Sequence, residues 1–219
     1  MSVTWRTDPF TGFAAAATLG PSSVHTHAGL LFAGDAGEPT RHLHLAWHHM
    51  LRSEEGLPTD MGWVEPGLDS FAIEDVRAAA MLIASREENQ RIPYALRLEG
   101  AHFDAEGRLV LGAGLGLTCA TFVLLIFAQA GVELLDRPSW DTGRSEQRRA
   151  EDEAHQEALV GYLRGTSGAR AHAERVKREV GCTRIRAEEV VAATGLSPHP
   201  VSYALAEPEG RALLPRVGR

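Results

Sequence analysis

Two neighbouring runs of residues in the first third of the chain show the period of a β-strand. Residues 24–34 are mostly apolar, and residues 41–51 alternate, with apolar side chains on one face and His42, His44 and His48 on the other. Alternation places successive side chains on opposite faces of a strand. The turn-rich segment between the two runs therefore predicts an antiparallel hairpin.

The next stretch of the chain mixes helical and strand signals. Residues 58–67 read as a loop, residues 73–88 have helical periodicity, and residues 92–98 and 108–111 are short strand candidates around a turn at 104–107. The apolar stripe of that helix is Val76, Ala79, Ala80 and Ile83. Spacing of i, i+3, i+4 and i+7 puts these four side chains on one buried face.

A second helix is predicted to begin at Cys119. A glycine-rich approach leads into Thr118, and an almost unbroken apolar segment then runs to Gly131. Threonine suits an N-cap and glycine a C-cap. Cys119 then lies in the first turn of a buried helix, where unpaired N–H groups and the positive end of the helix dipole favour a thiolate.

Beyond residue 140 the chain becomes rich in charged residues and alanine. Helices are expected at 145–164, 169–180 and 186–194, the first with an apolar seam at Ala158, Leu159 and Tyr162. Together these patterns predict an α+β fold, in which a small antiparallel sheet packs on the Cys119 helix. We expect a domain over residues 1–140 and a helical C-terminal extension over residues 141–219.

Composition narrows the function classes. The chain has 219 residues, 44% hydrophobic and 23% charged, with a net charge of −7. An acidic balance argues against a general nucleic-acid or membrane-surface binder, so neither partner is expected. The apolar run over 117–132 contains Gln129 and is too short to span a bilayer comfortably. The two cysteines make no disulfide framework and no secretory signal is expected in the opening residues, so a cytoplasmic setting is expected. The Ala/Gly/Arg-rich composition suggests a bacterial source.

Cysteine and histidine carry the candidate chemistry. Six of the ten histidines fall between His25 and His49, and Cys119 opens the apolar helix. A thiol at a helix N-terminus combines a nucleophile with the start of an oxyanion hole. It also needs a neighbouring imidazole to take its proton. The two features together favour a cysteine-dependent enzyme.

The segment His-Ala-Gly-Leu-Leu-Phe-Ala-Gly-Asp at 27–35 resembles the H-x-G-I-Y-L-G-D strand of the papain-like NlpC and lecithin-retinol-acyltransferase superfamily. In the circularly permuted branch of that superfamily, the histidine strand precedes a cysteine helix with a motif such as Asn-Cys-Glu-His-Phe-Val. Here the corresponding residues at 118–123 read Thr-Cys-Ala-Thr-Phe-Val. The resemblance covers roughly residues 24–131 and implies a permuted papain-like fold.

The resemblance also implies roles for individual residues. Cys119 would be the nucleophile, His27 the base, and a second histidine on the next strand would orient His27. By position that residue is His44, with His42 as the alternative. The expected reaction is hydrolysis or acyl transfer at an amide, ester or thioester bond of a small-molecule, peptide or acyl substrate. It requires no metal or organic cofactor, and neither the substrate nor the oligomeric state is predicted.

Three other interpretations compete with the enzyme. The pairs His25/His27 and His42/His44 each project from one strand face, as metal ligands do. Residues 190–205 resemble a helix-turn-helix with Val201 and Leu205 as core positions, although the second helix lacks the cations that DNA phosphates require. The glycines at 112–116 hint at a dinucleotide loop, but their spacing fails. We expect them instead to give the backbone room beside the Cys119 helix.

Overall fold

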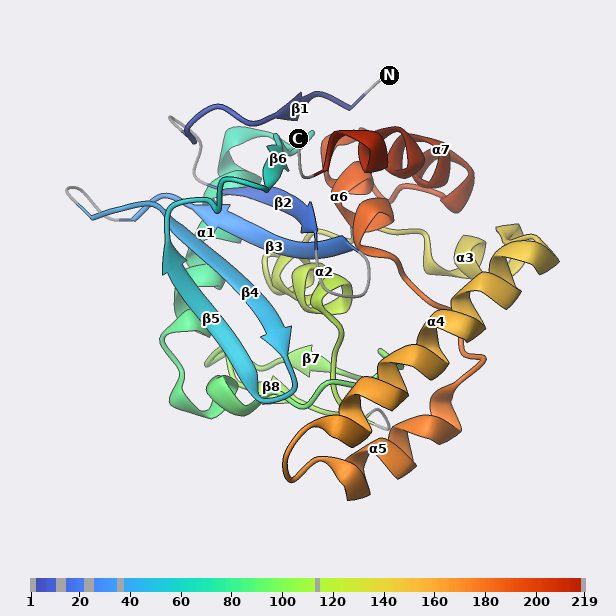
Figure 1. Cartoon of the computed structure of the whole chain (residues 1–219). Coiled ribbons are helices and arrows are strands. Elements are labelled where there is room, and N and C mark those ends of the chain that lie inside the picture. The colour runs from blue at the N-terminus through green and yellow to red at the C-terminus, as the bar shows by residue number, and fades with distance from the viewer. Residues whose placement is uncertain (1–2, 11–14, 22–25, 35–37, 113–114, 218–219) are drawn as a thin grey trace.

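The computed structural model describes residues 3–10, 15–21, 26–34, 38–112 and 115–217, and it has an α+β fold (Figure 1). One antiparallel sheet has the strand order β1-β6-β2-β3-β4-β5, and β7 and β8 form a second, two-stranded sheet. The strands are β1 (Trp5–Arg6), β2 (Ala15–Pro21), β3 (Thr26–Phe32), β4 (Arg41–Trp47), β5 (Met50–Glu55), β6 (Gly62–Val64), β7 (His102–Phe103) and β8 (Leu109–Val110). The α-helices are α1 (Ser70–Ala84), α2 (Cys119–Gln129), α3 (Arg137–Gly143), α4 (Glu146–Gly165), α5 (Arg170–Val176), α6 (Ala187–Gly195) and α7 (Tyr203–Leu213).

The predicted hairpin exists, but its second strand is shorter than expected. β3 and β4 pair antiparallel with Leu30 opposite Leu43. The expected strand over 41–51 is wrong because the chain reverses at His49, which adopts a left-handed φ of 58°. The residues after that turn form β5, which pairs back along β4. The alternating pattern continues through the turn, so it gives no sign of the second hairpin, formed by β4 and β5.

The sheet has two different faces. Ala28 and Leu30 of β3 and Leu43 and Leu45 of β4 belong to the main hydrophobic core, and α2 packs on this face. The residues between them, including His42 and His44, lie on the opposite face because side chains alternate along a strand. The predicted separation of apolar and histidine faces is therefore present.

The residues predicted to cap α2 adopt the expected conformations. The Thr118 hydroxyl accepts a hydrogen bond from the Thr121 backbone N–H, and the Thr121 hydroxyl accepts one from the Thr118 N–H. Gly131 has a φ of +76° just beyond the helix end, the conformation that favours glycine after a C-cap. The stripe predicted for the earlier helix is also the buried face of α1.

Several boundaries differ from the prediction. The expected loop at 58–67 contains β6, and the expected strand at 92–98 forms only an isolated parallel bridge between Tyr94 and Leu117. Gly116 explains that close approach, because a Cβ there would lie 2.1 Å from the Pro93 carbonyl oxygen.

The C-terminal helices share the main core with the sheet. α6 packs on β2 and β3, and its residues from Ala187 to Thr194 are buried. The domain boundary at 140/141 stays a prediction, because a shared core does not show whether residues 1–140 and 141–219 fold independently. Of the seam expected in α4, Leu159 is buried, whereas Ala158 and Tyr162 are exposed. The buried face of α4 also includes Val160, Leu163 and the polar residues Asp152, His155 and Gln156. In the part of the chain that the structure describes, no helix is both long enough and apolar enough to cross a bilayer.

Candidate active site

Cys119 lies where β3 and β4 separate. The two strands pair only from Leu30 onward, and they diverge toward the start of β3 (Figure 1). The N-terminus of α2 meets this opening, so that the Ala28 backbone N–H hydrogen-bonds to the Cys119 sulfur. The early termination of pairing therefore lets the thiol reach the strand that carries His27.

Cys119 and His27 line the same small cavity, of about 80 Å³. Tyr94, His155 and Arg184 line it as well. The thiol and the imidazole do not hydrogen-bond directly to each other in the described structure. A cavity of this size holds about two water molecules, and a water molecule can relay a proton between groups that do not touch. The structure therefore places the two predicted residues on the lining of one cavity.

Burial dominates the electrostatics of the thiol. It raises the pKa of Cys119 above its ordinary value, although the Ala28 N–H, the Arg184 charge, the Ala120 N–H and the Tyr94 hydroxyl each lower it. The first-turn N–H of Ala120 does favour the thiolate, as expected, but burial outweighs it in the resting protein. The thiol is neutral at pH 7, so it depends on a base to become a nucleophile.

His27 is a neutral base held by a second histidine. Its Nε2 lies 2.7 Å from Nδ1 of His44 on β4. Burial lowers the pKa of His27 to about 4, although the charge of Glu54 opposes this shift. Because Nε2 is engaged with His44, Nδ1 is the nitrogen left to accept a proton. The structure thus brings together His27 and His44, as the resemblance implied.

A carboxylate that the sequence did not reveal lies near the other ring nitrogen of His44, beyond hydrogen-bond distance. His44 Nε2 lies 3.6 Å from Glu54 Oε2 on β5. If His27 keeps its proton on Nε2, His44 must accept it at Nδ1 and carry its own proton on Nε2, facing Glu54. Burial lowers the pKa of His44 to about 4, so His27 and His44 are both neutral at pH 7. Glu54 was missed because it lies on the strand that the sequence pattern merged with β4.

His42 supports the position of His44. Its ring stacks on His44 with centroids 4.5 Å apart, and its Nε2 lies 2.9 Å from the Thr18 hydroxyl. A Cβ at Gly29 would lie 2.4 Å from that nitrogen and 3.0 Å from the Cβ of His44. The glycine two residues after His27 is therefore needed to seat both histidines.

Tyr94 is held firmly against the thiol. Its backbone N–H donates to His48 Nδ1 at 3.2 Å, and its carbonyl accepts from His172 Nε2 at 2.8 Å. Its hydroxyl interacts with both the thiol and the backbone N–H of Cys119, and burial raises its pKa well above the ordinary value. Tyr94 therefore presents a neutral O–H donor beside the sulfur. Trp47 also lines the cavity, whereas Trp63 packs in a separate buried cluster.

One group of side chains in the described residues could hold a metal ion. His42, His44 and Glu54 offer ligand atoms that all lie within 4.8 Å of one another. Nδ1 of His42 and Nε2 of His44 are buried with no hydrogen-bond partner. Imidazole and carboxylate are ligands that zinc accepts. His25, which the sequence pattern paired with His27, lies outside the described residues.

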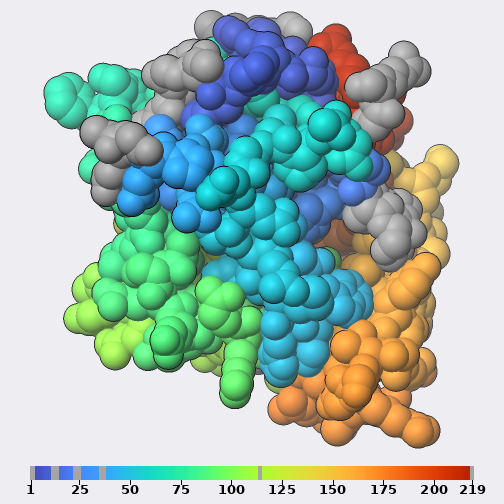
Figure 2. All heavy atoms as spheres, turned by 60° about the vertical axis from the view of Figure 1, so that its left-hand side comes forward, coloured from blue at the N-terminus to red at the C-terminus, as the bar shows by residue number. Residues whose placement is uncertain are grey.

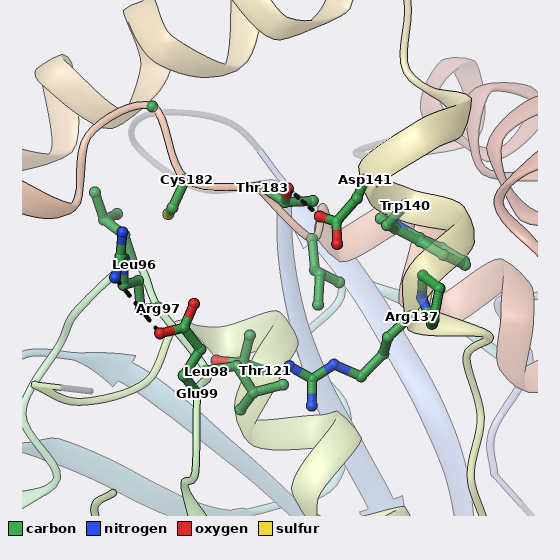
Figure 3. Close-up of a pocket in the computed structure, with 13 residues that line it drawn as sticks. Leu96, Arg97, Leu98, Glu99, Thr121, Arg137, Trp140, Asp141, Cys182 and Thr183 are labelled. Carbon is green, nitrogen blue, oxygen red and sulfur yellow. Dashed lines mark hydrogen bonds and ion pairs between the residues drawn. The ribbon is translucent and has the colours of Figure 1, made fainter. Parts of the chain in front are cut away.

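Cys182 occupies a separate cavity of about 520 Å³ (Figure 3). The Gln156 amide lies 3.5 Å from its sulfur, and burial raises the pKa of this thiol to about 11. Arg97 and Glu99 line the same cavity, which contains no histidine. Among the residues that the structure describes, Cys182 therefore shares its cavity with no imidazole that could accept its proton.

The helix-turn-helix interpretation meets an obstacle in the packing. α6, its first helix, is buried against the sheet, and Val201 is buried as expected. Leu205, however, is 59% exposed rather than a core position.

No protein-family model, no curated protein and no solved structure matches this chain.

Proposed function

We propose that the protein is a cysteine-dependent hydrolase or acyl transferase of permuted papain-like type, acting on an amide, ester or thioester bond. The observation that carries the proposal is the 2.7 Å contact between His27 and His44 in a site whose cavity also contains Cys119. An imidazole fixed at one nitrogen by a second imidazole is the arrangement that a thiol nucleophile needs for deprotonation.

The reaction begins with transfer of the Cys119 proton to Nδ1 of His27. The sulfur attacks the substrate carbonyl carbon, and the oxygen that becomes negative accepts hydrogen bonds from the Cys119 backbone N–H and the Tyr94 hydroxyl. Collapse of this intermediate expels the leaving group, which takes the proton from His27. Water or another acceptor then attacks the thioester in a second step of the same kind. His44 accepts from Nε2 of His27 throughout and so leaves Nδ1 of His27 as the nitrogen that takes the proton, across the cavity that the two residues share.

The surroundings of the site support a substrate that extends beyond the small inner cavity. A second cavity of about 680 Å³ lies between β4 and α4, lined by Trp47 and Tyr162. Figure 2 shows the orange end of α4 beside the cyan β4–β5 hairpin. The Trp47 indole donates to the Thr166 hydroxyl at 2.9 Å, which ties this hairpin to the end of α4. The helices after residue 140 therefore contribute walls to the candidate substrate site.

A thiol-directed acyl probe tests the proposal. We expect time-dependent labelling of wild-type protein at pH 7, no labelling at position 119 in Cys119→Ala, and strongly reduced labelling in His27→Ala. Cys182→Ala is the matched control and should label as the wild type does. Circular dichroism checks that each variant is folded. Unchanged labelling in folded His27→Ala would overturn the assignment of the base.

A second candidate function rests on the buried nitrogens of His42 and His44, which have no partner and lie near Glu54. A divalent ion bound to Nε2 of His44 would leave the His44 proton on Nδ1. That proton would point at Nε2 of His27 and place the His27 proton on Nδ1, the nitrogen that must accept from the thiol. Metal binding and thiol catalysis therefore exclude each other at this site.

Zinc titration separates the two functions. The metal-binding candidate predicts stoichiometric zinc uptake that His42→Ala and Glu54→Gln both abolish, with wild-type Cys119 unreactive toward acyl probes. The enzyme predicts labelling of Cys119 without zinc, and loss of that labelling when zinc occupies His44. Retention of zinc by His42→Ala would exclude this ligand set.

A further inference from the structure

Arg184 is a buried cation with unused hydrogen-bond donors beside the candidate nucleophile. It follows Cys182 in the segment between α5 and α6, and only 16% of its side chain is exposed. It lines the inner cavity with Cys119 and Tyr94, and its charge acts on both of these groups. The guanidinium therefore lies at the place where a substrate would meet the thiol.

The protein gives Arg184 little compensation. Among the described residues its single hydrogen bond is a long one, 3.4 Å from Nη1 to Asp152 Oδ1. The same carboxylate already pairs with Arg144 and, at 2.7 Å, with Nε of Arg186. Asp152 is thus satisfied without Arg184. A guanidinium has five N–H donors, so most of those of Arg184 stay available to a ligand in the cavities that it lines.

Arg184 also borders a larger outer cavity of about 670 Å³. Thr26 and His155 line both cavities with it, so the three side chains mark the junction between them. Glu151 and Glu188 also line the outer cavity, and Oε2 of Glu188 on α6 accepts from the Thr26 hydroxyl at 2.8 Å. Its charge attracts Arg184 but forms no hydrogen bond with it.

We propose that Arg184 forms a carboxylate-binding subsite, so that the substrate carries a carboxylate close to the bond that Cys119 attacks. A carboxylate matches the planar fork of a guanidinium with two parallel hydrogen bonds. The remainder of the substrate would occupy the outer cavity. The substrate class is therefore an anionic acyl compound, such as an amide or ester next to a free carboxylate. The proposal rests on the proposed function in that Cys119 must be a reactive thiol.

Two alkylating reagents of nearly equal size test this subsite. Iodoacetate carries a carboxylate and iodoacetamide a neutral amide. In both reactions the sulfur forms a bond to the CH₂ carbon, iodide leaves, and the thiol proton is lost to His27 or to water. Peptide-resolved mass spectrometry gives the rate ratio of the two reagents at Cys119, and the ratio at Cys182 in the same molecule is the internal reference. Folded wild type, Arg184→Gln, Arg184→Lys and Arg97→Gln are compared.

The expected result is a ratio that favours iodoacetate at Cys119 and falls about tenfold in Arg184→Gln, since a charge-assisted pair contributes at least that much to recognition. Arg184→Lys should keep part of the preference. Arg97→Gln, beside the other thiol, should leave the ratio at Cys119 unchanged. In wild type alone, succinate should slow the reaction of Cys119 with iodoacetamide, and succinamide should not.

Two results would overturn the subsite, and they differ in what they say about the enzyme. Alkylation of Cys119 by both reagents, with a ratio indifferent to Arg184 and no protection by succinate, rejects carboxylate binding and leaves the nucleophile standing. Resistance of Cys119 to both reagents in the folded protein rejects the nucleophile and the subsite together.

Discussion

The two thiols of this protein are both buried enough to have raised pKa values, yet their surroundings differ in kind. Cys119 opens a helix and shares a small cavity with His27, Tyr94 and Arg184. Cys182 lies in a loop beside Gln156, in a cavity with a mixed pair of charges and no histidine. Neither thiol has a lowered pKa, so the pKa of the thiol does not distinguish the two sites. The difference is the presence of a fixed proton acceptor.

This comparison changes the role of the helix N-terminus. At Cys119 the first-turn N–H groups and the Arg184 charge lower the pKa of the thiol, but burial outweighs them. Their effect is larger on a charge that appears during the reaction than on the resting thiol, because the donors are already oriented in a buried site. The helix start therefore stabilises the charge that develops in the transition state, and His27 accepts the thiol proton.

The largest expected effect is that of His27→Ala on the two thiols. Loss of a general base costs about 10²- to 10⁴-fold in rate, so labelling of Cys119 at pH 7 should fall by at least about a hundredfold. Labelling of Cys182 should not change. Raising the pH to 10 should narrow the difference at Cys119, because hydroxide can then remove the proton. Equal losses at both cysteines would point to a general disturbance of the fold.

The parts of this site that the sequence predicted are those with local signals. Thr118 and Gly131 mark the ends of α2 because capping depends on residues within one turn. The alternation of β4 separated His42 and His44 from the core face for the same reason. Even the choice between these two histidines was left open, because both lie on one face and only the register with β3 brings His44 to His27.

The residues that the sequence did not reveal come to the site through long-range packing. The position of Glu54 depends on a turn at His49, and no glycine marks that turn in the sequence. Arg184 lies in an irregular segment between helices, and its unused donors become apparent only when Asp152 is seen to have other partners. No periodicity records such contacts, because they follow from how α4 and α6 pack around the sheet.

The pH dependence of the two thiols should differ in shape. His27 is neutral above its pKa of about 4, so general-base labelling of Cys119 should stay nearly constant from about pH 5 to pH 8. Labelling of Cys182, whose pKa is about 11, should rise about tenfold with each pH unit over the same range. Cys119 is therefore labelled most selectively in mild acid. A slope at Cys119 as steep as that at Cys182 would remove His27 from the reaction.

The same histidines set an acid limit to the fold. Burial lowers the pKa of His42 to about 3 and of His44 to about 4, so the unfolded chain binds more protons than the folded one as the pH falls below about 6.5. Their contribution to stability is complete above pH 6.5 and is lost as the pH falls toward 4. Urea unfolding at pH 7 and pH 5 should show this loss, and His42→Gln should make it smaller.

Gly29→Ala tests whether the histidine face supports only the Cys119 site. The new Cβ would displace His42 from Thr18, and overpacking with loss of a buried hydrogen bond costs about 1–3 kcal/mol in unfolding free energy. Labelling of Cys119 should fall several-fold, while Cys182 stays unaffected. Gly161→Ala on α4 is the matched control, because a Cβ there meets no atom within 4 Å and should slightly stabilise the helix.

The smallest expected effect is that of Glu54→Gln, and it asks how far the relay behind the thiol extends. The carboxylate lies 3.6 Å from Nε2 of His44 and is 53% exposed, so water screens much of its influence. The amide can still accept the His44 proton, and labelling of Cys119 should fall only about two- to threefold. Because the Glu54 charge raises the pKa of His27, the acid edge of the labelling profile should move to lower pH in the variant. An unchanged edge would end the relay at His44, which alone then accounts for the orientation of His27.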